Sequence, residues 1–239
     1  MSRGRLFLMP TLLGSEQWEH VIPTEVAEIA KKTRYFAVED IKSARRYLRK
    51  LDREFPIDDS TFYILNKKTP PHELKTMLAP LKNGFDVCII SEAGCPGIAD
   101  PGADLVALAH QTGEFVSPLT GPSSILLGLI GSGFNGQSFA FNGYVPKDRK
   151  ARIATFKDFE YLANKTGQTQ IFMETPFRNN HLLEDLLNDC MDNTFLCIAC
   201  DLTLHSERIQ TMTIAEWRDK AFSLEKRPTM FLIGKPFTK

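Results

Sequence analysis

The chain has 239 residues, of which 43% are hydrophobic and 24% charged, a composition that is ordinary for a soluble globular enzyme. Lysine and arginine (29 residues) balance aspartate and glutamate (29 residues), which argues against a non-specific nucleic-acid binder but leaves room for a local basic patch. No apolar run approaches the roughly 18 residues that span a membrane, and five cysteines do not form the pattern of a disulfide framework. The N-terminus lacks the features of a signal peptide, so we expect a cytoplasmic protein without a membrane segment.

The first half of the sequence alternates short apolar runs with helical patterns. Strands are expected at residues 5–10, 35–38, 61–65, 86–90 and 115–118. Helices are expected at residues 23–32, 43–53, 73–81 and 103–110. Because this alternation implies right-handed crossovers, we predict an α/β fold with a doubly wound, mostly parallel sheet. An irregular α+β domain is the alternative.

The second half of the sequence has a different order of expected strands and helices. Strands are expected at residues 139–145, 170–174, 194–202, 207–214 and 229–233. Helices are expected at residues 147–164, 179–191 and 215–225. The last three strand runs lie close together, which suggests antiparallel pairing and therefore a mixed sheet.

A short segment, residues 119–124, separates the two halves. Gly121 frees the backbone there, and Pro122 suits the first turn of a helix. The helix expected over residues 125–130 is apolar all round and should be buried. We predict two α/β domains, an N-terminal one at residues 1–118 and a C-terminal one at residues 119–239.

Residues 91–102, with the sequence SEAGCPGIADPG, form the most conspicuous loop. They follow the apolar run 86–90, at what should be the carboxyl end of a buried strand. In open α/β sheets, ligands bind in the crevice outside those ends. Glycine and proline let a backbone turn sharply and hold its shape. This loop is the first candidate for the active site.

Two formal motifs do not suit their setting. Residues 131–136 match G-x-G-x-x-G, but they follow a helix and precede a strand, the reverse of the order that binds a dinucleotide. Cys197 and Cys200 form a C-x-x-C within an apolar strand, so we expect buried structural cysteines. The five histidines show no metal-binding spacing, and no metal site is expected.

Three charged stretches are candidates for chemistry or binding. Glu39 and Asp40 stand at a strand end, either as a general base or ligand contact, or as a carboxylate pair at a helix N-terminus. The basic face at residues 45–53 is either a solvated helix surface or an edge that contacts phosphate. A second basic cluster lies within residues 147–152 at a helix start, where cations oppose the helix dipole. Binding of a polyanionic partner is one candidate explanation for basic residues at this position.

Seven stretches, taken in order, carry a family resemblance. They are residues 10–14, 39–40, 91–102, 118–124, 143–146, 174–178 and 230–234. Together they resemble the tetrapyrrole-methylase superfamily of S-adenosylmethionine (SAM) methyltransferases. Within it, the sequence is most similar to the branch that methylates the ribose 2′-hydroxyl of a cytidine in bacterial 16S ribosomal RNA. The central loop resembles that branch's S-D-A-G-T-P-x-I-x-D-P-G.

The resemblance implies two α/β domains with SAM in a cleft between them, and usually a homodimer. It also implies ribosomal RNA or the small ribosomal subunit as the partner. Family contacts to SAM come mostly from loop backbone. Carried over by position, the expected SAM contacts are Leu13, Glu92, Cys95, Ser123, Ser124, Met173, Ile198 or Ala199, Thr229 and Met230.

Some positions depart from the branch's pattern. Glu92 stands where the branch has aspartate, and Cys95 where it has threonine. Lys42 stands where the branch has arginine, so a point charge replaces a forked guanidinium. If these groups position RNA or activate its hydroxyl, the choice of acceptor has changed.

Methyl transfer requires the acceptor oxygen to lie close behind the methyl carbon. A ribose hydroxyl is a poor nucleophile, so we expect Glu39 or Asp40 to assist as a base. Lys150, Arg152 and Arg178 are expected to bind RNA phosphate. The alternatives are methylation of a small molecule such as a tetrapyrrole, and a non-catalytic SAM- or RNA-binding module in ribosome assembly.

Overall fold

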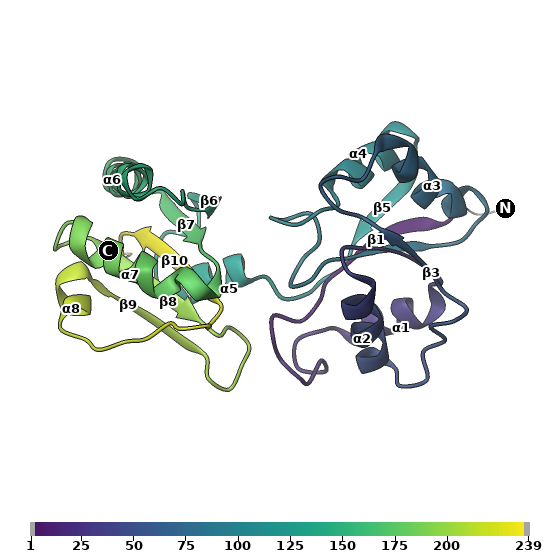
Figure 1. The fold of residues 1–239 in the computed structure, drawn as a ribbon, viewed down its shortest axis with the longest axis horizontal. Coiled ribbons are helices and arrows are strands. Elements are labelled where there is room, and N and C mark those ends of the chain that lie inside the picture. The colour runs from purple at the N-terminus through teal and green to yellow at the C-terminus, as the bar shows by residue number, and fades with distance from the viewer. Residues whose placement is uncertain (1–2, 237–239) are drawn as a thin grey trace. The chain divides into compact units, whose positions relative to one another are not determined.

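The computed structural model describes residues 3–236. The chain divides into two compact units, Met1–Ser123 and Ser124–Lys239, and each unit contains one sheet (Figure 1). The domain boundary expected after residue 118 lies at the end of strand β5 (Phe115–Pro118), a few residues before this division.

The first unit contains a five-stranded parallel sheet with the order β3-β2-β4-β1-β5. Its other strands are β1 (Arg5–Met9), β2 (Tyr35–Val38), β3 (Thr61–Ile64) and β4 (Val87–Ile90). Because all the strands are parallel, their carboxyl ends share one edge, where the loops after the strands meet. The predicted doubly wound parallel sheet is confirmed.

Two helices cover each face of this sheet (Figure 1). They are α1 (Thr24–Lys32) and α2 (Ile41–Leu51) on one face, and α3 (Pro71–Lys82) and α4 (Ala103–Gln111) on the other. Successive residues of a strand point to opposite faces. Cys88 and Ile90 of β4 therefore pack under α1 and α2, whereas Val87 and Ile89 pack under α3 and α4. All four side chains are buried, which explains the continuous apolar run in the sequence.

The second unit contains a five-stranded mixed sheet with the order β6-β7-β10-β8-β9. Its strands are β6 (Phe139–Tyr144), β7 (Thr169–Met173), β8 (Phe195–Cys200), β9 (Arg208–Thr213) and β10 (Thr229–Gly234). Only β6 and β7 pair in parallel, and the remaining pairs are antiparallel. The predicted mixed sheet is confirmed.

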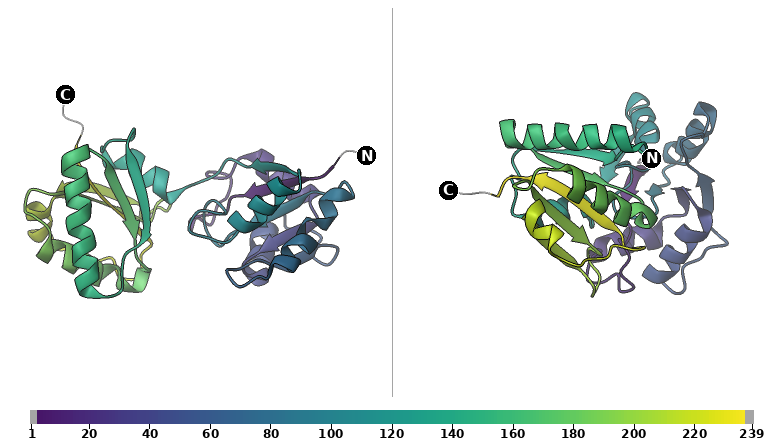
Figure 2. Two further views of the ribbon diagram at one scale, coloured as in Figure 1. Left: turned by 90° about the horizontal axis from the view of Figure 1, so that it is seen from above. Right: turned by 60° about the vertical axis from the view of Figure 1, so that its left-hand side comes forward.

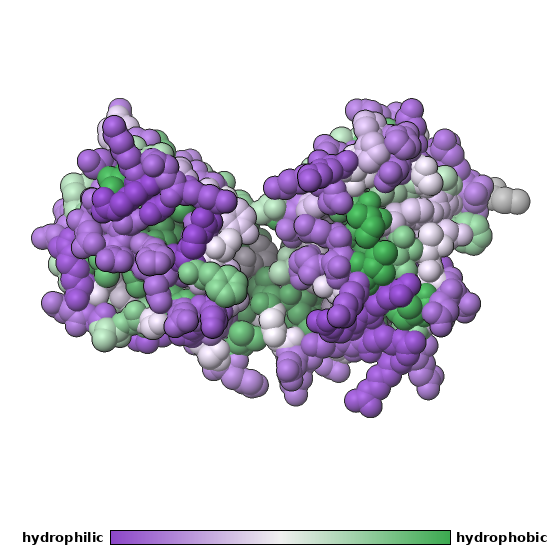
Figure 3. Space-filling view, in the orientation of Figure 1, coloured by the Kyte–Doolittle hydropathy of each residue, from purple (hydrophilic) through white to green (hydrophobic). Residues whose placement is uncertain are grey.

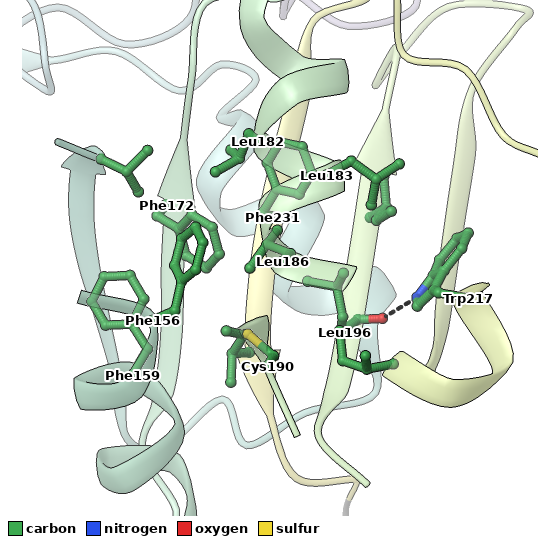
Figure 4. Packing of buried hydrophobic residues seen from close by; sticks show 14 of the residues in the cluster. Phe156, Phe159, Phe172, Leu182, Leu183, Leu186, Cys190, Leu196, Trp217 and Phe231 are labelled. Atoms are coloured by element: carbon green, nitrogen blue, oxygen red, sulfur yellow. Dashed lines mark hydrogen bonds between the residues drawn. The ribbon is translucent and has the colours of Figure 1, made fainter. Parts of the chain in front are cut away.

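One face of the second sheet holds an aromatic core. It is covered by α6 (Arg149–Thr166), which lies along the strands in Figure 2, and by α7 (Asn179–Asp189) after a short 3₁₀ turn, Pro176–Arg178. The rings of Phe172 and Phe231 stack with their centroids 5.8 Å apart (Figure 4). Trp217 closes the core and donates its ring N–H to the carbonyl oxygen of Leu196 at 2.9 Å. Buried aromatic rings contribute much of the stability of such a core.

Helix α5 (Ser124–Ser132) covers the opposite face of this sheet, and here the expectation of a buried helix was wrong. The glycines face the strands: a Cβ at Gly131 would lie 2.6 Å from Ile209 Cδ1. This close approach turns the bulky side chains outward, so that Leu126 is 50% exposed and Ile130 78% exposed. An all-apolar sequence predicts burial on every side, but the glycines decide which side packs.

Helix α8 (Ile214–Arg218) is much shorter than the helix expected over residues 215–225. It begins with a capping box between Thr213 and Glu216, and it ends before a loop in which Leu224 donates its backbone N–H to the Asn180 side chain at 2.7 Å. A tertiary hydrogen bond to α7 therefore replaces the helical one that the sequence pattern suggested.

The two formal motifs have the structural roles that were predicted. Residues 131–136 end α5 and lead into a loop rather than opening a helix. Cys197 and Cys200 are fully buried within β8, and burial raises the pKa of the Cys197 thiol to about 11. Across residues 3–236, no group of three or more His, Cys, Asp or Glu side chains is placed to hold a metal ion. No helix in this range is both long enough and apolar enough to cross a membrane.

Candidate active site

The loops that follow β1, β4 and β5 are joined at the carboxyl edge of the first unit's sheet. The backbone N–H of Thr11 donates to the carbonyl oxygen of Gly94 at 2.8 Å. The Cys95 thiol donates to the carbonyl oxygen of Pro122, with the sulfur 3.6 Å away. These bonds hold three loops together where a ligand of an open α/β sheet would bind.

At Gly94, residues 91–102 approach the neighbouring loops closely. Its φ of +69° lies in the left-handed region. A Cβ there would meet Leu13 Cδ2 at 3.3 Å and the Pro122 carbonyl oxygen at 3.4 Å. The glycine therefore permits both the turn and the contact.

A pocket of about 290 Å³ opens beside these loops. Its walls come from the loop after β1, from α2 and from the end of β4. The volume is just below the range of about 300–1,000 Å³ that is usual for small-ligand sites. Its polar lining includes Thr11, Ser43, Arg46, Lys50, Ser91 and Glu92.

Asp100, in the same central loop, shares this edge with two other carboxylates. Burial raises its pKa, the charges of Glu39 and Glu92 add to the rise, and the Ser91 hydroxyl and Lys67 oppose it. Raised carboxyl pKa values are typical of sites that handle protons. The sequence prediction included Asp100 only as part of the loop; the signal that it merited separate attention was an acid between glycines and prolines at a strand end.

Asp40 caps helix α2. Its carboxylate accepts the backbone N–H of Ser43 at 2.7 Å, and this bond holds the pKa of Asp40 below its usual value. Glu39 is exposed and makes no hydrogen bond or ion pair within the described part of the chain. The helix-cap interpretation therefore describes Asp40, while a catalytic role for either residue stays a prediction.

Comparisons with known proteins give the family. No protein-family model matches the chain. The ribosomal RNA small subunit methyltransferase I of Vibrio cholerae is 32% identical over 211 residues, which cover 88% of this chain and 69% of that protein. The chain belongs to the ribosomal RNA small subunit methyltransferase I family. Family members from Escherichia coli O157:H7 and Bacillus subtilis are each 28% identical, over 90% and 89% of this chain and 71% and 68% of their own lengths.

Solved structures show the fold of this family member. The methyltransferase CobJ superposes with a TM-score of 0.63 at 16% identity, covering 99% of this chain and 96% of CobJ. The uroporphyrin-III-C-methyltransferase from Thermus thermophilus superposes with a TM-score of 0.55 at 14% identity, covering 98% and 93%. The tetrapyrrole-methylase fold is confirmed, and family membership confirms the predicted class of enzyme, a methyltransferase.

Four of the expected SAM contacts lie in the first unit. Leu13 and Cys95 belong to the joined loops, and Glu92 lines the pocket. Ser123 is half-buried and follows Pro122 at the end of the unit. The structure thus brings Leu13, Glu92 and Cys95 to one edge, although their contact with SAM stays a prediction.

Three of the expected SAM contacts in the second unit form a row across its sheet. Met230 of β10 pairs with Met173 of β7 on one side and with Ala199 of β8 on the other. A Cβ on Gly128 of α5 would lie 3.6 Å from the Cβ atoms of both Ala199 and Met230. Because α5 covers these two side chains, contacts with a ligand would have to come from their backbone groups.

The remaining expected SAM contacts of this unit lie elsewhere. Ile198 pairs with Phe231 and points into the aromatic core, on the face opposite Ala199. Thr229 begins β10 and donates its hydroxyl to the Arg227 carbonyl oxygen at 3.0 Å. Ser124 begins α5. Of the alternative Ile198 or Ala199, only Ala199 shares a row with Met173 and Met230.

The two arginines of the second basic cluster have partners within their own unit. Asp185 of α7 accepts hydrogen bonds from Arg149 and Arg152, with Nε–O distances of 2.9 Å for each. Arg152 also donates to the carbonyl oxygens of Pro146 and Lys147. An acidic neighbouring helix therefore offsets the unfavourable position of these cations near a helix N-terminus, and a polyanion is not needed to account for them.

The three expected phosphate ligands differ in their surroundings. Arg152 is engaged by Asp185, and Arg178 donates to Glu174 at 2.5 Å and to Thr175 at 3.3 Å. Lys150 is exposed and has no ion pair within residues 3–236. Their roles in RNA binding stay predictions.

Proposed function

We propose that this protein transfers a methyl group from SAM to a ribose 2′-hydroxyl of small-subunit ribosomal RNA. The observation that carries the proposal is the match, over 88% of the chain, to a protein named ribosomal RNA small subunit methyltransferase I. A ribosomal substrate also agrees with the cytoplasmic location expected from the sequence.

The first unit offers groups that fit SAM. The turn at Gly94 brings loop backbone next to Leu13, and Cys95 lies at the same edge, bonded to the carbonyl oxygen of Pro122. Loops of this kind suit a cofactor that is held largely by backbone contacts. SAM supplies the reactive methyl group, and the protein supplies alignment.

Glu39 is the better placed of the two proposed bases. Asp40 is held by the backbone of α2, which lowers its pKa and weakens it as a proton acceptor. Glu39 is exposed at the end of β2 and lies close enough to Asp100 to raise the pKa of that carboxyl. In this proposal the Glu39 carboxylate takes the proton of the ribose hydroxyl.

The decisive experiment is transfer of a tritiated methyl group from SAM to small ribosomal subunits that lack the modification, with large subunits as the control. A 2′-O-methyl group removes the hydroxyl that alkali needs to cleave the next phosphodiester bond. Label should therefore survive alkaline hydrolysis in a dinucleotide. Label on a base, or only in a small molecule, would reject the proposal.

We also propose that the protein is a homodimer, as the resemblance implies. Exposed apolar side chains such as Ile130, 78% exposed on α5, support an interface of this kind. Light scattering coupled to size-exclusion chromatography tests it. A monomer mass at micromolar concentration would count against it.

A further inference from the structure

The basic residues of α2 fall into two groups with different surroundings. Arg45 lies over the Phe62 ring, 5.2 Å from its centroid, and Arg49 donates to the carbonyl oxygen of Arg53 at 2.8 Å. Arg46 and Lys50 make no ion pair or hydrogen bond within residues 3–236 and line the pocket described above. In Figure 3 the surface over α2 is strongly hydrophilic.

The spacing of residues along α2 explains why Arg46 and Lys50 line the pocket together. Ser43, Arg46, Tyr47 and Lys50 occupy positions i, i+3, i+4 and i+7, so they share one face of α2. The Tyr47 hydroxyl donates to the carbonyl oxygen of Pro10 at 2.7 Å. This bond fastens the loop after β1 to the helix and holds the wall of the pocket in place.

The inner part of the pocket carries a buried hydroxyl, that of Thr11, whose hydrogen-bonding capacity is unused within residues 3–236. Thr11 is 4% exposed, and its hydroxyl oxygen has no hydrogen-bond partner in this described part of the chain. Ser91 is 5% exposed, and its hydroxyl acts on the nearby Asp100 carboxyl. A buried hydroxyl without a partner lowers stability, so such groups are uncommon in folded proteins. Glu92 adds a carboxylate that could accept from a sugar hydroxyl or a base amino group.

We propose that this pocket binds one nucleotide of the substrate RNA, with Arg46 and Lys50 holding its phosphate and the Thr11 hydroxyl hydrogen-bonding to its ribose. The pocket volume of about 290 Å³ suits a single nucleotide rather than a duplex segment. Two cations that are unpaired within residues 3–236 match a phosphate anion, and the buried Thr11 hydroxyl matches a ribose. The inference rests on the proposed function, because it names where the RNA of that reaction would bind.

The first test compares two double variants that remove the same charge. Arg46→Ala/Lys50→Ala should raise the KM for small subunits by about tenfold or more and leave kcat and SAM affinity nearly unchanged. The slope of log affinity against log salt for a single-stranded RNA should fall in magnitude by about 0.7, because the contact with one phosphate is lost. Arg45→Ala/Arg49→Ala should change KM less than about threefold. An equal rise in KM in both variants would show a general electrostatic attraction of RNA rather than a site. A loss of SAM affinity in Arg46→Ala/Lys50→Ala would assign the pocket to the cofactor. Either result overturns the proposal.

The second test uses the buried hydroxyl. Thr11→Val removes it and should leave the ligand-free protein as stable as the wild type or more stable, while weakening binding of cytidine 5′-monophosphate. Thr11→Ser keeps the hydroxyl and should keep the affinity. If Thr11→Val destabilises the fold and leaves nucleotide binding unchanged, the hydroxyl has a structural role and the proposal is wrong.

Direct titration separates this inference from the proposed function. Wild-type protein should bind cytidine 5′-monophosphate more tightly than cytidine or inorganic phosphate, and Arg46→Ala/Lys50→Ala should abolish the difference. If ribosomal RNA is methylated but this preference is absent, the pocket proposal fails and the function stands. If the preference is present but no subunit is methylated, the function fails and the nucleotide pocket stands.

Discussion

The backbone N–H of Thr11 donates to the carbonyl oxygen of Gly94, and this 2.8 Å hydrogen bond ties the loop after β1 to the loop after β4. The two loops come from neighbouring strands of the sheet, so the bond spans the edge at which the pocket opens. The shape of the candidate site therefore depends on the turn at Gly94.

Gly94→Ala should disturb this turn. Its φ of +69° costs an alanine roughly 1–2 kcal/mol, and the new Cβ would press on Leu13 and Pro122. We expect a lower free energy of unfolding and weaker SAM binding, measured by urea denaturation and calorimetry. Gly136→Ala is the control, because a Cβ there meets nothing within 4 Å. Wild-type SAM affinity in Gly94→Ala would exclude this turn from the cofactor site.

Glu39→Gln and Asp40→Asn should separate catalysis from helix capping. Asparagine caps a helix about as well as aspartate, so Asp40→Asn should keep its stability and methylate RNA within a few-fold of the wild-type rate. Glu39→Gln should lower kcat by about 10²-fold or more, with SAM affinity unchanged. Single-turnover methyl transfer measures both. The base assignment would have to be withdrawn if the two variants showed the same rate.

Asp185→Ala should destabilise the second unit. It leaves the guanidinium of Arg152, 13% exposed, without its main partner, and breaking such a buried pair costs about 3 kcal/mol. Asp189→Ala, which breaks only an exposed pair with Arg149, should cost less than about 1 kcal/mol. Equal costs would show that the Asp185 pair is as well solvated as the surface one.

The Asp185 carboxylate should also make the free energy of unfolding depend on pH. Burial works to raise the pKa of Asp185, but hydrogen bonds from Arg152 and Arg149 outweigh it and hold the pKa below the ordinary value of 3.8. Its contribution to stability is therefore complete above that value and is lost as the pH falls through the lower, folded-state pKa. The difference in unfolding free energy between wild type and Asp185→Ala should shrink in acid. A constant difference from pH 7 to pH 2 would contradict this.

Asp100→Asn should change stability in the opposite direction to Asp185→Ala, because it removes a carboxylate that destabilises the folded protein at neutral pH. Burial and the charges of Glu39 and Glu92 raise the pKa of Asp100 in the folded state, so the ionised form destabilises the protein at neutral pH and the cost disappears as the pH falls. The variant should melt at a higher temperature than wild type at pH 7 and near the wild-type temperature in acid. Asp104→Asn, in the first turn of α4, should show no such gain. A lower melting temperature for Asp100→Asn at pH 7 would mean that the carboxylate is stabilised by its surroundings.

The positions of most strands and the parallel or mixed character of each sheet followed from the sequence where periodicity was clear. The apolar run at β4 is buried on both faces, and the close spacing of β8, β9 and β10 matches their position in the antiparallel part of a mixed sheet. The errors involve tertiary contacts: Gly131 decides which side of α5 packs, and Asn180 of α7 takes the backbone N–H of Leu224 in the loop where a longer α8 was expected. Local periodicity contains neither contact.

The candidate site was predictable only in part. The Gly- and Pro-rich loop identified the edge of the sheet, but the basic residues of α2 looked alike until the structure separated Arg46 and Lys50 from Arg45 and Arg49. The acidic helix beside Arg152 could not be found either, because Asp185 is far away in the sequence. Pairing across the fold, rather than residue type, decides which cations are available.

Trp217 is buried and hydrogen-bonded to Leu196, and it gives the protein an internal fluorescent probe. The chain has only one other tryptophan, Trp18, which packs against the core of the first unit. Each half of the molecule thus contains its own fluorophore. Trp18→Phe and Trp217→Phe would each leave one emission signal, so the melting of the two halves could be followed separately and the cooperativity between them read directly.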